Sequence, residues 1–88
     1  MTARIYVTGF VQHVGFRQFV KSKANKLNIK GWVKNLPDGR VEAIIQGDKK
    51  NVENLVEMCW KGPFLAHVKD IVIKEEENGN FEFFEILH

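Results

Sequence analysis

Residues 3–20 read ARIYVTGFVQHVGFRQFV, and the spacing of their apolar side chains changes within this one stretch. Up to residue 11 apolar and other side chains alternate, with many β-branched residues, a period of two that predicts a β-strand. From Phe16 to Leu27 apolar residues recur at intervals of three and four with lysines between them, which predicts an amphipathic helix. A strand therefore passes through a short loop into a helix, and Arg17 stands where that helix begins.

In the rest of the chain, too, strand-like and helix-like spacings of apolar side chains follow one another. Segments 30–35 (KGWVKN) and 40–47 (RVEAIIQG) predict strands joined as a hairpin by the Pro and Asp-Gly of NLPDG. Residues 48–62 predict a second helix, with Asp48 as its N-cap and an apolar face of Val, Leu and Cys at helical spacing. Segments 68–75 and 81–86 predict a fourth strand and a last short strand after the turn sequence NGN.

The order strand, helix, strand, strand, helix, strand indicates an α+β fold of the ferredoxin-like (β-α-β-β-α-β) type. We expect a four-stranded antiparallel sheet of order 4-1-3-2, two helices on one of its faces, and a short C-terminal strand. A length of 88 residues is enough for one core and too short for two, so we expect a single domain over residues 1–88.

Composition and charge exclude few classes of function. A formal net charge of +2, without a cluster of basic residues, gives no argument for a nucleic-acid or membrane partner. Cys59 is the only cysteine, which precludes an internal disulfide, and its place on the apolar helix face favours a buried side chain over a nucleophile. With no apolar leader and no 18-residue apolar run in the sequence, we expect a cytoplasmic protein, and a monomer as the starting assumption.

The predicted topology brings two polar residues to one edge of the sheet. The first and second strands run parallel, so the start of the first helix and the end of the second strand meet, and Arg17 should lie near Asn35. The loop QHVGF can turn its N–H groups towards one anion, helped by the helix dipole and by the arginine fork. The neutral amide of Asn35 can hold a water molecule beside that anion.

Such a site offers no obvious carboxylate pair, nucleophilic cysteine or metal cluster, so its substrate needs a leaving group that departs unaided. The carboxylate of an acyl phosphate is such a group, because its conjugate acid has a pKa of about 4–5. Positioning a water molecule and stabilising the phosphoryl oxygens then suffices for hydrolysis.

Two segments of the chain, GFVQHVGFR at 9–17 and GWVKNLPDGRVE at 31–42, resemble the two signatures of the acylphosphatase family, G-x-V-Q-G-V-x-F-R and G-x-V-x-N-x-x-D-G-x-V-E. The resemblance spans nearly the whole chain. It implies hydrolysis of carboxyl-phosphate anhydrides without a metal or an organic cofactor, with Arg17 binding phosphate and Asn35 orienting the attacking water. It also implies that the phosphate cradle is formed by the loop residues Gln12, His13, Val14, Gly15, Phe16 and Arg17.

One position departs from the family pattern, because His13 stands where the family usually has glycine. Glycine in a tight loop often supplies a positive φ, which histidine tolerates better than most residues but not freely. We expect the fold to survive and the activity to be lowered or pH-dependent. The alternative is a noncatalytic or weakened anion-binding module.

Simpler interpretations of each residue remain open. Taken alone, Arg17 is more often a surface arginine and Asn35 a residue that starts a turn. The same fold also carries RNA-recognition domains, but these place aromatic residues outward on the third strand, and RVEAIIQG has none. A further possibility is a regulatory domain like the acylphosphatase-like segment of larger hydrogenase-maturation proteins. His67 and His88 give no indication of a metal site.

Overall fold

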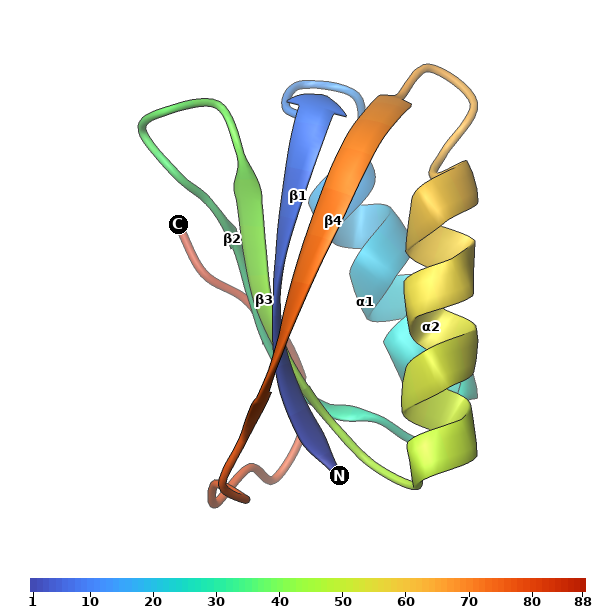
Figure 1. Cartoon of the computed structure of the whole chain (residues 1–88), viewed down its shortest axis with the longest axis vertical. Helices are drawn as coiled ribbons and strands as arrows, with labels where there is room; N and C mark the ends of the chain where they lie inside the picture. Colours follow the sequence, from blue (N-terminus) through green and yellow to red (C-terminus); the bar gives the residue numbers. More distant parts are fainter.

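The computed structural model describes all 88 residues as one sheet with two helices. The elements follow the predicted order, and their bounds are β1 (Thr2–Phe10), α1 (Phe16–Lys26), β2 (Lys30–Asn35), β3 (Val41–Gln46), α2 (Lys49–Lys61), β4 (His67–Glu76) and β5 (Phe84–Ile86). Both helices cover the same face of the sheet (Figure 1). The strand order is β4-β1-β3-β2-β5, which confirms the ferredoxin-like arrangement.

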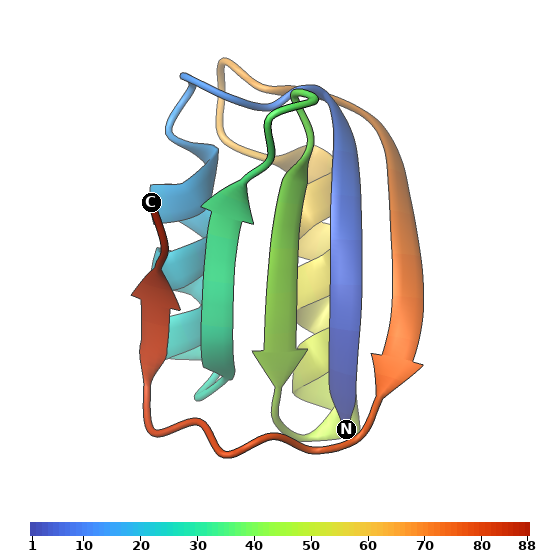
Figure 2. The ribbon, with the colours of Figure 1, turned by 90° about the vertical axis from the view of Figure 1, so that its left-hand side faces the viewer.

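The C-terminal strand joins the sheet instead of standing apart from it. β5 is shorter than the predicted segment 81–86 and pairs parallel to β2, with Gly31 opposite Phe84 (Figure 2). The N–H of Leu87 continues the ladder by donating to the carbonyl of Val33 at 2.9 Å. The sheet is therefore five-stranded and mixed, because β5 covers the edge of β2 that four strands would leave open.

The core lies between the sheet and the helices, as the two periods predict. β1 contributes Ala3, Ile5 and Val7, all fully buried, and α1 adds Phe16, 2 % exposed, to the same core. Burial of one such large apolar side chain stabilises the fold by about 1.5–3 kcal/mol. The change of period near residue 16 thus marks the point where the chain leaves the sheet and turns back across it.

Two residues at α2 bear on the sequence predictions. Asp48 occupies the N-cap position, but its side chain makes no capping hydrogen bond. Cys59 is fully buried, and burial raises the pKa of its thiol to about 12, so the thiolate that a nucleophile requires does not form at neutral pH. Neither helix has the length and apolar character that a membrane crossing requires.

Candidate active site

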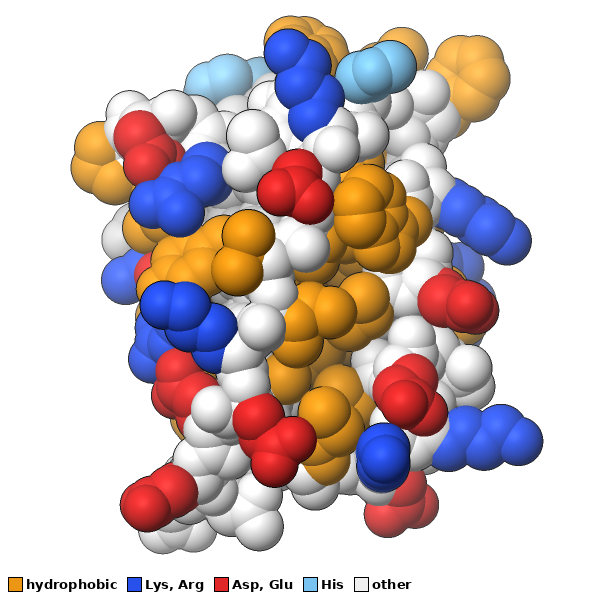
Figure 3. Space-filling view, in the orientation of Figure 1, with side chains coloured by type: hydrophobic (Ala, Val, Ile, Leu, Met, Phe, Trp, Pro, Cys, Tyr) orange, Lys and Arg blue, Asp and Glu red, His pale blue; other side chains and the backbone are white.

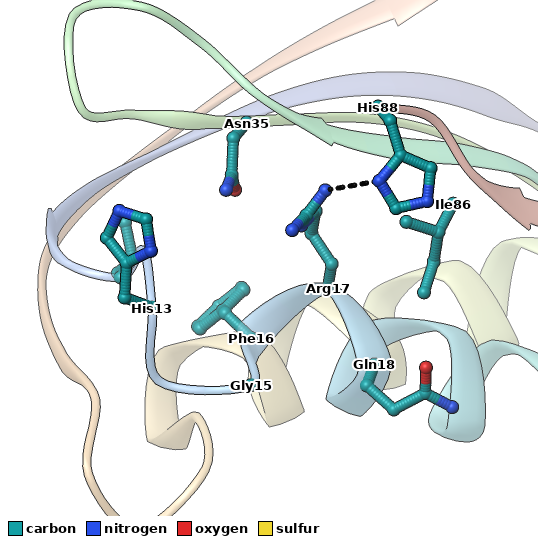
Figure 4. Close-up of a pocket in the computed structure, with 9 residues that line it drawn as sticks. His13, Gly15, Phe16, Arg17, Gln18, Asn35, Ile86 and His88 are labelled. Carbon is teal, nitrogen blue, oxygen red and sulfur yellow. Dashed lines mark hydrogen bonds between the residues drawn. The ribbon is translucent and has the colours of Figure 1, made fainter.

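A pocket of about 220 Å³ opens where β1 and β2 end and α1 begins. β1 and β2 both pair antiparallel with β3, so they run in the same direction and their ends meet at this edge. The pocket is lined by Val11, His13, Gly15, Phe16, Arg17, Gln18, Asn35, Ile86 and His88. The fold thus places Arg17 and Asn35 in one pocket, and no acidic residue lines it (Figure 4).

The loop between β1 and α1 has an unusual backbone conformation. His13 and Gly15 both adopt the left-handed region, with φ of 64° and 78°. A Cβ on Gly15 would meet no atom within 4 Å, so glycine suits this position for its φ and not for lack of space. Gly15 precedes the right-handed residues of α1, and such an alternation turns successive N–H groups towards a common point.

These N–H groups are free within the chain. No backbone N–H from His13 through Gln18 donates to a carbonyl or to a side chain, and the first turn of α1 contains no acidic residue. Gly15 has no side chain with which to cap the helix. A helix N-terminus in this state attracts an anion, because its unpaired donors and the helix dipole both favour negative charge.

Two of the predicted loop residues serve the loop itself. The side-chain amide of Gln12 donates to the carbonyls of Leu36, at 2.8 Å, and Arg40, at 2.9 Å. This ties the loop to the turn that follows Asn35. Val14 packs against the core. The side chains of Gln12 and Val14 therefore do not line the pocket, and the prediction that they join the cradle concerns their backbone N–H groups alone.

Arg17 extends into the pocket without a carboxylate partner. Its Nη1 donates to the Leu87 carbonyl at 3.4 Å and lies 3.4 Å from Nδ1 of His88 (Figure 4). Both contacts are long, and both come from the segment that follows β5. The helix dipole disfavours a cation at a helix N-terminus. An anion bound between the guanidinium of Arg17 and the N–H groups at the start of α1 offsets this unfavourable interaction.

Asn35 ends β2 with its amide turned into the same pocket (Figure 4). Its Oδ1 is buried and accepts no hydrogen bond, and it is the one buried side-chain nitrogen or oxygen in the chain that lacks a partner. Because an unpaired buried acceptor costs free energy, such an atom points to a ligand or a water molecule that supplies the missing hydrogen.

The turn after Asn35 is braced by a local ion pair. The carboxylate of Asp38 accepts hydrogen bonds from the backbone N–H of Arg40 at 3.1 Å and from its Nε at 2.8 Å. The first of these is the main reason why the pKa of Asp38 is lowered. The guanidinium of Arg40 also stacks on Tyr6, 4.8 Å from the ring centre.

Sequence reasoning did not place four of the nine lining residues in the pocket, namely Val11, Gln18, Ile86 and His88. Val11 and Gln18 directly flank the predicted loop, so widening the segment by one residue at each end would have included both. Ile86 and His88 reach the pocket because β5 pairs with β2, and a short strand some 70 residues from Arg17 gives no local signal of that pairing.

Comparison with known proteins assigns the chain to a family. The acylphosphatase family model matches residues 3–86. The chain belongs to the acylphosphatase family. Curated acylphosphatases from Nostoc sp. and Nitrosococcus oceani are 45 % and 46 % identical over 84 and 83 residues. These alignments cover 96 % and 94 % of this chain, and 83 % and 93 % of the two relatives.

Solved structures agree with this assignment. The crystal structure of the Bacillus subtilis acylphosphatase superposes with a TM-score of 0.95 at 38 % identity, covering 99 % of this chain and 98 % of that one. HypF from T. kodakarensis also contains the fold, with a TM-score of 0.86 and 36 % identity, but the match covers 12 % of that much longer chain. The fold thus occurs both alone and as part of a larger protein.

Proposed function

We infer that this acylphosphatase hydrolyses carboxyl-phosphate anhydrides to a carboxylate and phosphate, and that Arg17 binds the phosphoryl group while Asn35 orients the water. One observation carries the assignment of roles. An arginine without a carboxylate partner and a buried amide oxygen without a hydrogen-bond donor line the same pocket. A phosphoryl group and a water molecule are together the partners that these two groups lack.

Phosphate binding follows from the donors that meet at the start of α1. The free N–H groups from His13 through Gln18 and the fork of Arg17 offer hydrogen bonds to the phosphoryl oxygens. Because no acidic side chain lines the pocket, no side-chain carboxylate there repels the two negative charges of the phosphoryl group. The same donors stabilise the transition state, in which charge spreads over the equatorial oxygens.

Asn35 acts on the nucleophile. Its Oδ1 accepts a hydrogen bond from the water molecule, which fixes the water's orientation and leaves a lone pair free to attack. As the new bond from water oxygen to phosphorus forms, the bond from phosphorus to the bridging oxygen breaks. The bridging oxygen keeps the electron pair and leaves as the carboxylate. The attacking water loses its proton to solvent, so that acyl phosphate and water give carboxylate, phosphate and a proton.

This scheme explains the sparse machinery of the site. A carboxylate leaving group needs no proton donor, because the pKa of its acid is about 4–5. An alkyl phosphate would need one. No acidic side chain lines the pocket, and the two histidines that do, His13 and His88, are both exposed to solvent. We therefore propose that the chain acts without a metal or organic cofactor on acyl phosphates and not on phosphate esters of alcohols.

We further propose that residues 1–88 act as one domain in the cytoplasm, where the free Cys59 is compatible with a reducing environment. One copy of the chain contributes every residue assigned a role above, so activity needs no partner. The outward side chains of β3 include no aromatic residue for stacking bases, and we propose no nucleic-acid partner.

The conformation of His13 favours an active enzyme over a weakened anion-binding module. Histidine here adopts the left-handed φ of 64° that a glycine would supply, so the loop keeps its turn without one. His13 is exposed and lines the pocket beside the free N–H groups. Its side chain therefore affects access to the site more than the shape of the cradle.

The test is hydrolysis of benzoyl phosphate in ¹⁸O-labelled water, with phenyl phosphate as the matched ester. We expect turnover of benzoyl phosphate alone, with the label in the released phosphate and not in benzoate, and competitive inhibition by inorganic phosphate. Label in benzoate would show attack at the acyl carbon and overturn the role given to Asn35. Equal turnover of the ester would overturn the leaving-group argument.

A further inference from the structure

The edge of the sheet formed by β4 is open and partly apolar. β4 pairs with β1 on one side and has no strand on the other, and it lies at the opposite edge from β5 (Figure 2), whose Ile86 lines the pocket. Val72 and Ile73 at the middle of β4 are 46 % and 48 % exposed. An open edge of ten residues with exposed β-branched side chains is a template for pairing with another strand.

The adjacent helix adds an apolar side chain to this edge. Met58 faces α1, because it lines a hollow together with Phe19 and Lys23. Trp60 follows two positions later, about 200° around the helix, so it lies on the flank of α2 away from α1, and it is 46 % exposed. Hydrophobic side chains gather along the face between β4 and α2, with charged side chains around them (Figure 3).

The sequence of β4 is complementary to itself when reversed. Residues 69–75 read KDIVIKE, so Asp70 and Lys74 stand at equal distances from Val72, with isoleucines between. Asp70 and Lys74 are exposed and take part in no ion pair within the chain. We propose that β4 pairs antiparallel with β4 of a second copy of this chain, with the two-fold axis at Val72.

This register matches the five central positions of the strand, residues 70–74. Asp70 of one copy faces Lys74 of the second copy, and by symmetry Lys74 faces Asp70, which gives two ion pairs. Ile71 faces Ile73 in the same way, and Val72 faces itself. Opposite residues in an antiparallel pair lie on the same face of the sheet, where opposite charges and apolar pairs each contribute about 0.2–1 kcal/mol.

Neighbouring registers lack this match. Opposite residues must lie on the same face of the sheet, so the register can change only in steps that shift each partner by two residues. One such step places Val72 opposite Asp70, and the other places Val72 opposite Lys74 and Asp70 opposite Glu76. Lys69 also carries the charge opposite to that of Glu75, but the pairing of β4 with β1 shifts next to Lys69, so the argument rests on Asp70 and Lys74.

The pairing joins two sheets into one of ten strands and leaves both pockets at its outer edges. A single pair of strands with one flanking helix from each copy forms an interface at the small end of the range for specific complexes. The dimer is therefore weak and forms with rising concentration, in contrast to the monomer assumed from the sequence. It does not involve Arg17 or Asn35, so its existence is independent of the proposed catalytic roles.

The test is the mass in solution by analytical ultracentrifugation from low micromolar to millimolar concentration. We expect the mean mass to rise from 10.2 kDa towards twice that value. Asp70→Lys and Lys74→Asp each create like-charge pairs and should weaken the dimer by about tenfold or more. The double swap D70K/K74D restores opposite charges and should restore the dimer.

Two controls make the outcome specific. Lys50→Asp makes the same charge change as Lys74→Asp, but at an exposed position on α2, and should leave the dissociation constant unchanged. Val72→Cys should form a disulfide-linked dimer on mild oxidation, since the two cysteines meet at the axis, whereas Lys50→Cys should not. A mass that stays at 10.2 kDa throughout, or a double swap no better than the single variants, would overturn the proposal.

Discussion

The outer face of the sheet, which points away from the helices, and the pocket at the edge of the sheet each contain an arginine, but only the arginine on the outer face has carboxylate partners. On the outer face Arg4 pairs with both Glu42 and Glu76, and Lys34 lies 3.8 Å from Glu42. Arg4 and Lys34 also lie over the ring of Trp32, at 5.8 and 5.2 Å from its centre. Hydrogen bonds to Glu76 and Glu42 raise the pKa of Arg4 above its ordinary value. In the pocket, by contrast, Arg17 has no carboxylate partner.

This difference separates stability from function. A polar group that finds its partner inside the chain stabilises the fold, and one that is left unpaired costs free energy until a ligand completes it. Substitutions on the outer face should therefore reduce stability and spare activity. Substitutions in the pocket should change activity and leave stability nearly unchanged. Four experiments test this division and a fifth tests the turn beside the pocket, in order of expected effect.

The largest effect is expected for Arg17→Ala. It removes the charged fork from the pocket, and kcat/KM for benzoyl phosphate should fall by about 10²–10³-fold, the usual cost of a lost donor that stabilises the transition state. Inhibition by inorganic phosphate should weaken in parallel. Because both contacts of Arg17 are 3.4 Å long, the urea midpoint should hardly move. The control is Lys21→Ala on the same helix, and equal losses in both variants would refute the role of Arg17.

Asn35→Ala tests the unpaired amide. We expect kcat to fall by about 10²-fold, since the water is no longer oriented, while phosphate inhibition is retained. The free energy of unfolding should be unchanged or higher by up to about 1 kcal/mol, because an unsatisfied buried acceptor has been removed. A variant that loses stability and keeps its turnover would show that Asn35 serves the hairpin alone.

Glu42→Gln is the counterpart on the outer face. Glu42 is 6 % exposed, and removing its charge leaves Arg4 with one carboxylate partner instead of two. The free energy of unfolding should fall by about 1.5–3 kcal/mol, the value of a hydrogen bond to a charged group. Turnover of the folded enzyme should not change, and a loss of turnover at full folding would break the division between the two regions.

His13→Gly replaces the residue that departs from the family pattern. Turnover should rise by about two- to fivefold, because a bulky side chain leaves the mouth of the pocket, and a barrier lower by up to about 1 kcal/mol corresponds to this range. Glycine also relieves the strain of the left-handed φ at this position. The net stability change should be small, since glycine also gains freedom in the unfolded chain. Gly15→Ala places a side chain in the same left-handed conformation and should lower turnover. Unchanged turnover in His13→Gly would remove His13 as a modulator.

The smallest effect is expected for Asp38→Asn in the turn that follows Asn35. The folded-state pKa of Asp38 is below its unfolded value, so its carboxylate stabilises the fold at pH values above the unfolded pKa. That contribution is lost as the pH falls through the folded-state pKa. The stability difference between wild type and variant should thus be present at pH 7 and shrink below about pH 4. A difference independent of pH would show that the ion pair with Arg40 is not its cause.

Much of the fold was predictable because its signals are local. The change of period at residue 16 reports which side chains face the core, and Ile5, Val7 and Phe16 are buried as that period requires. Arg17 and Asn35 were predictable as neighbours, since parallel strands bring their ends to one edge whatever the details of packing. The position of β5 was not, because a three-residue strand carries too few side chains to specify its partner.

The order of strands and helices, the two motifs of the pocket and the family follow from the amino-acid sequence alone, because periodicity and motif spacing are properties of neighbouring residues. Tertiary structure decided that Asn35 is left without a partner, that β5 brings Ile86 and His88 to Arg17, and that β4 is left as an open edge. Each of these depends on which groups from distant segments come within hydrogen-bonding distance, and that is fixed when the chain packs.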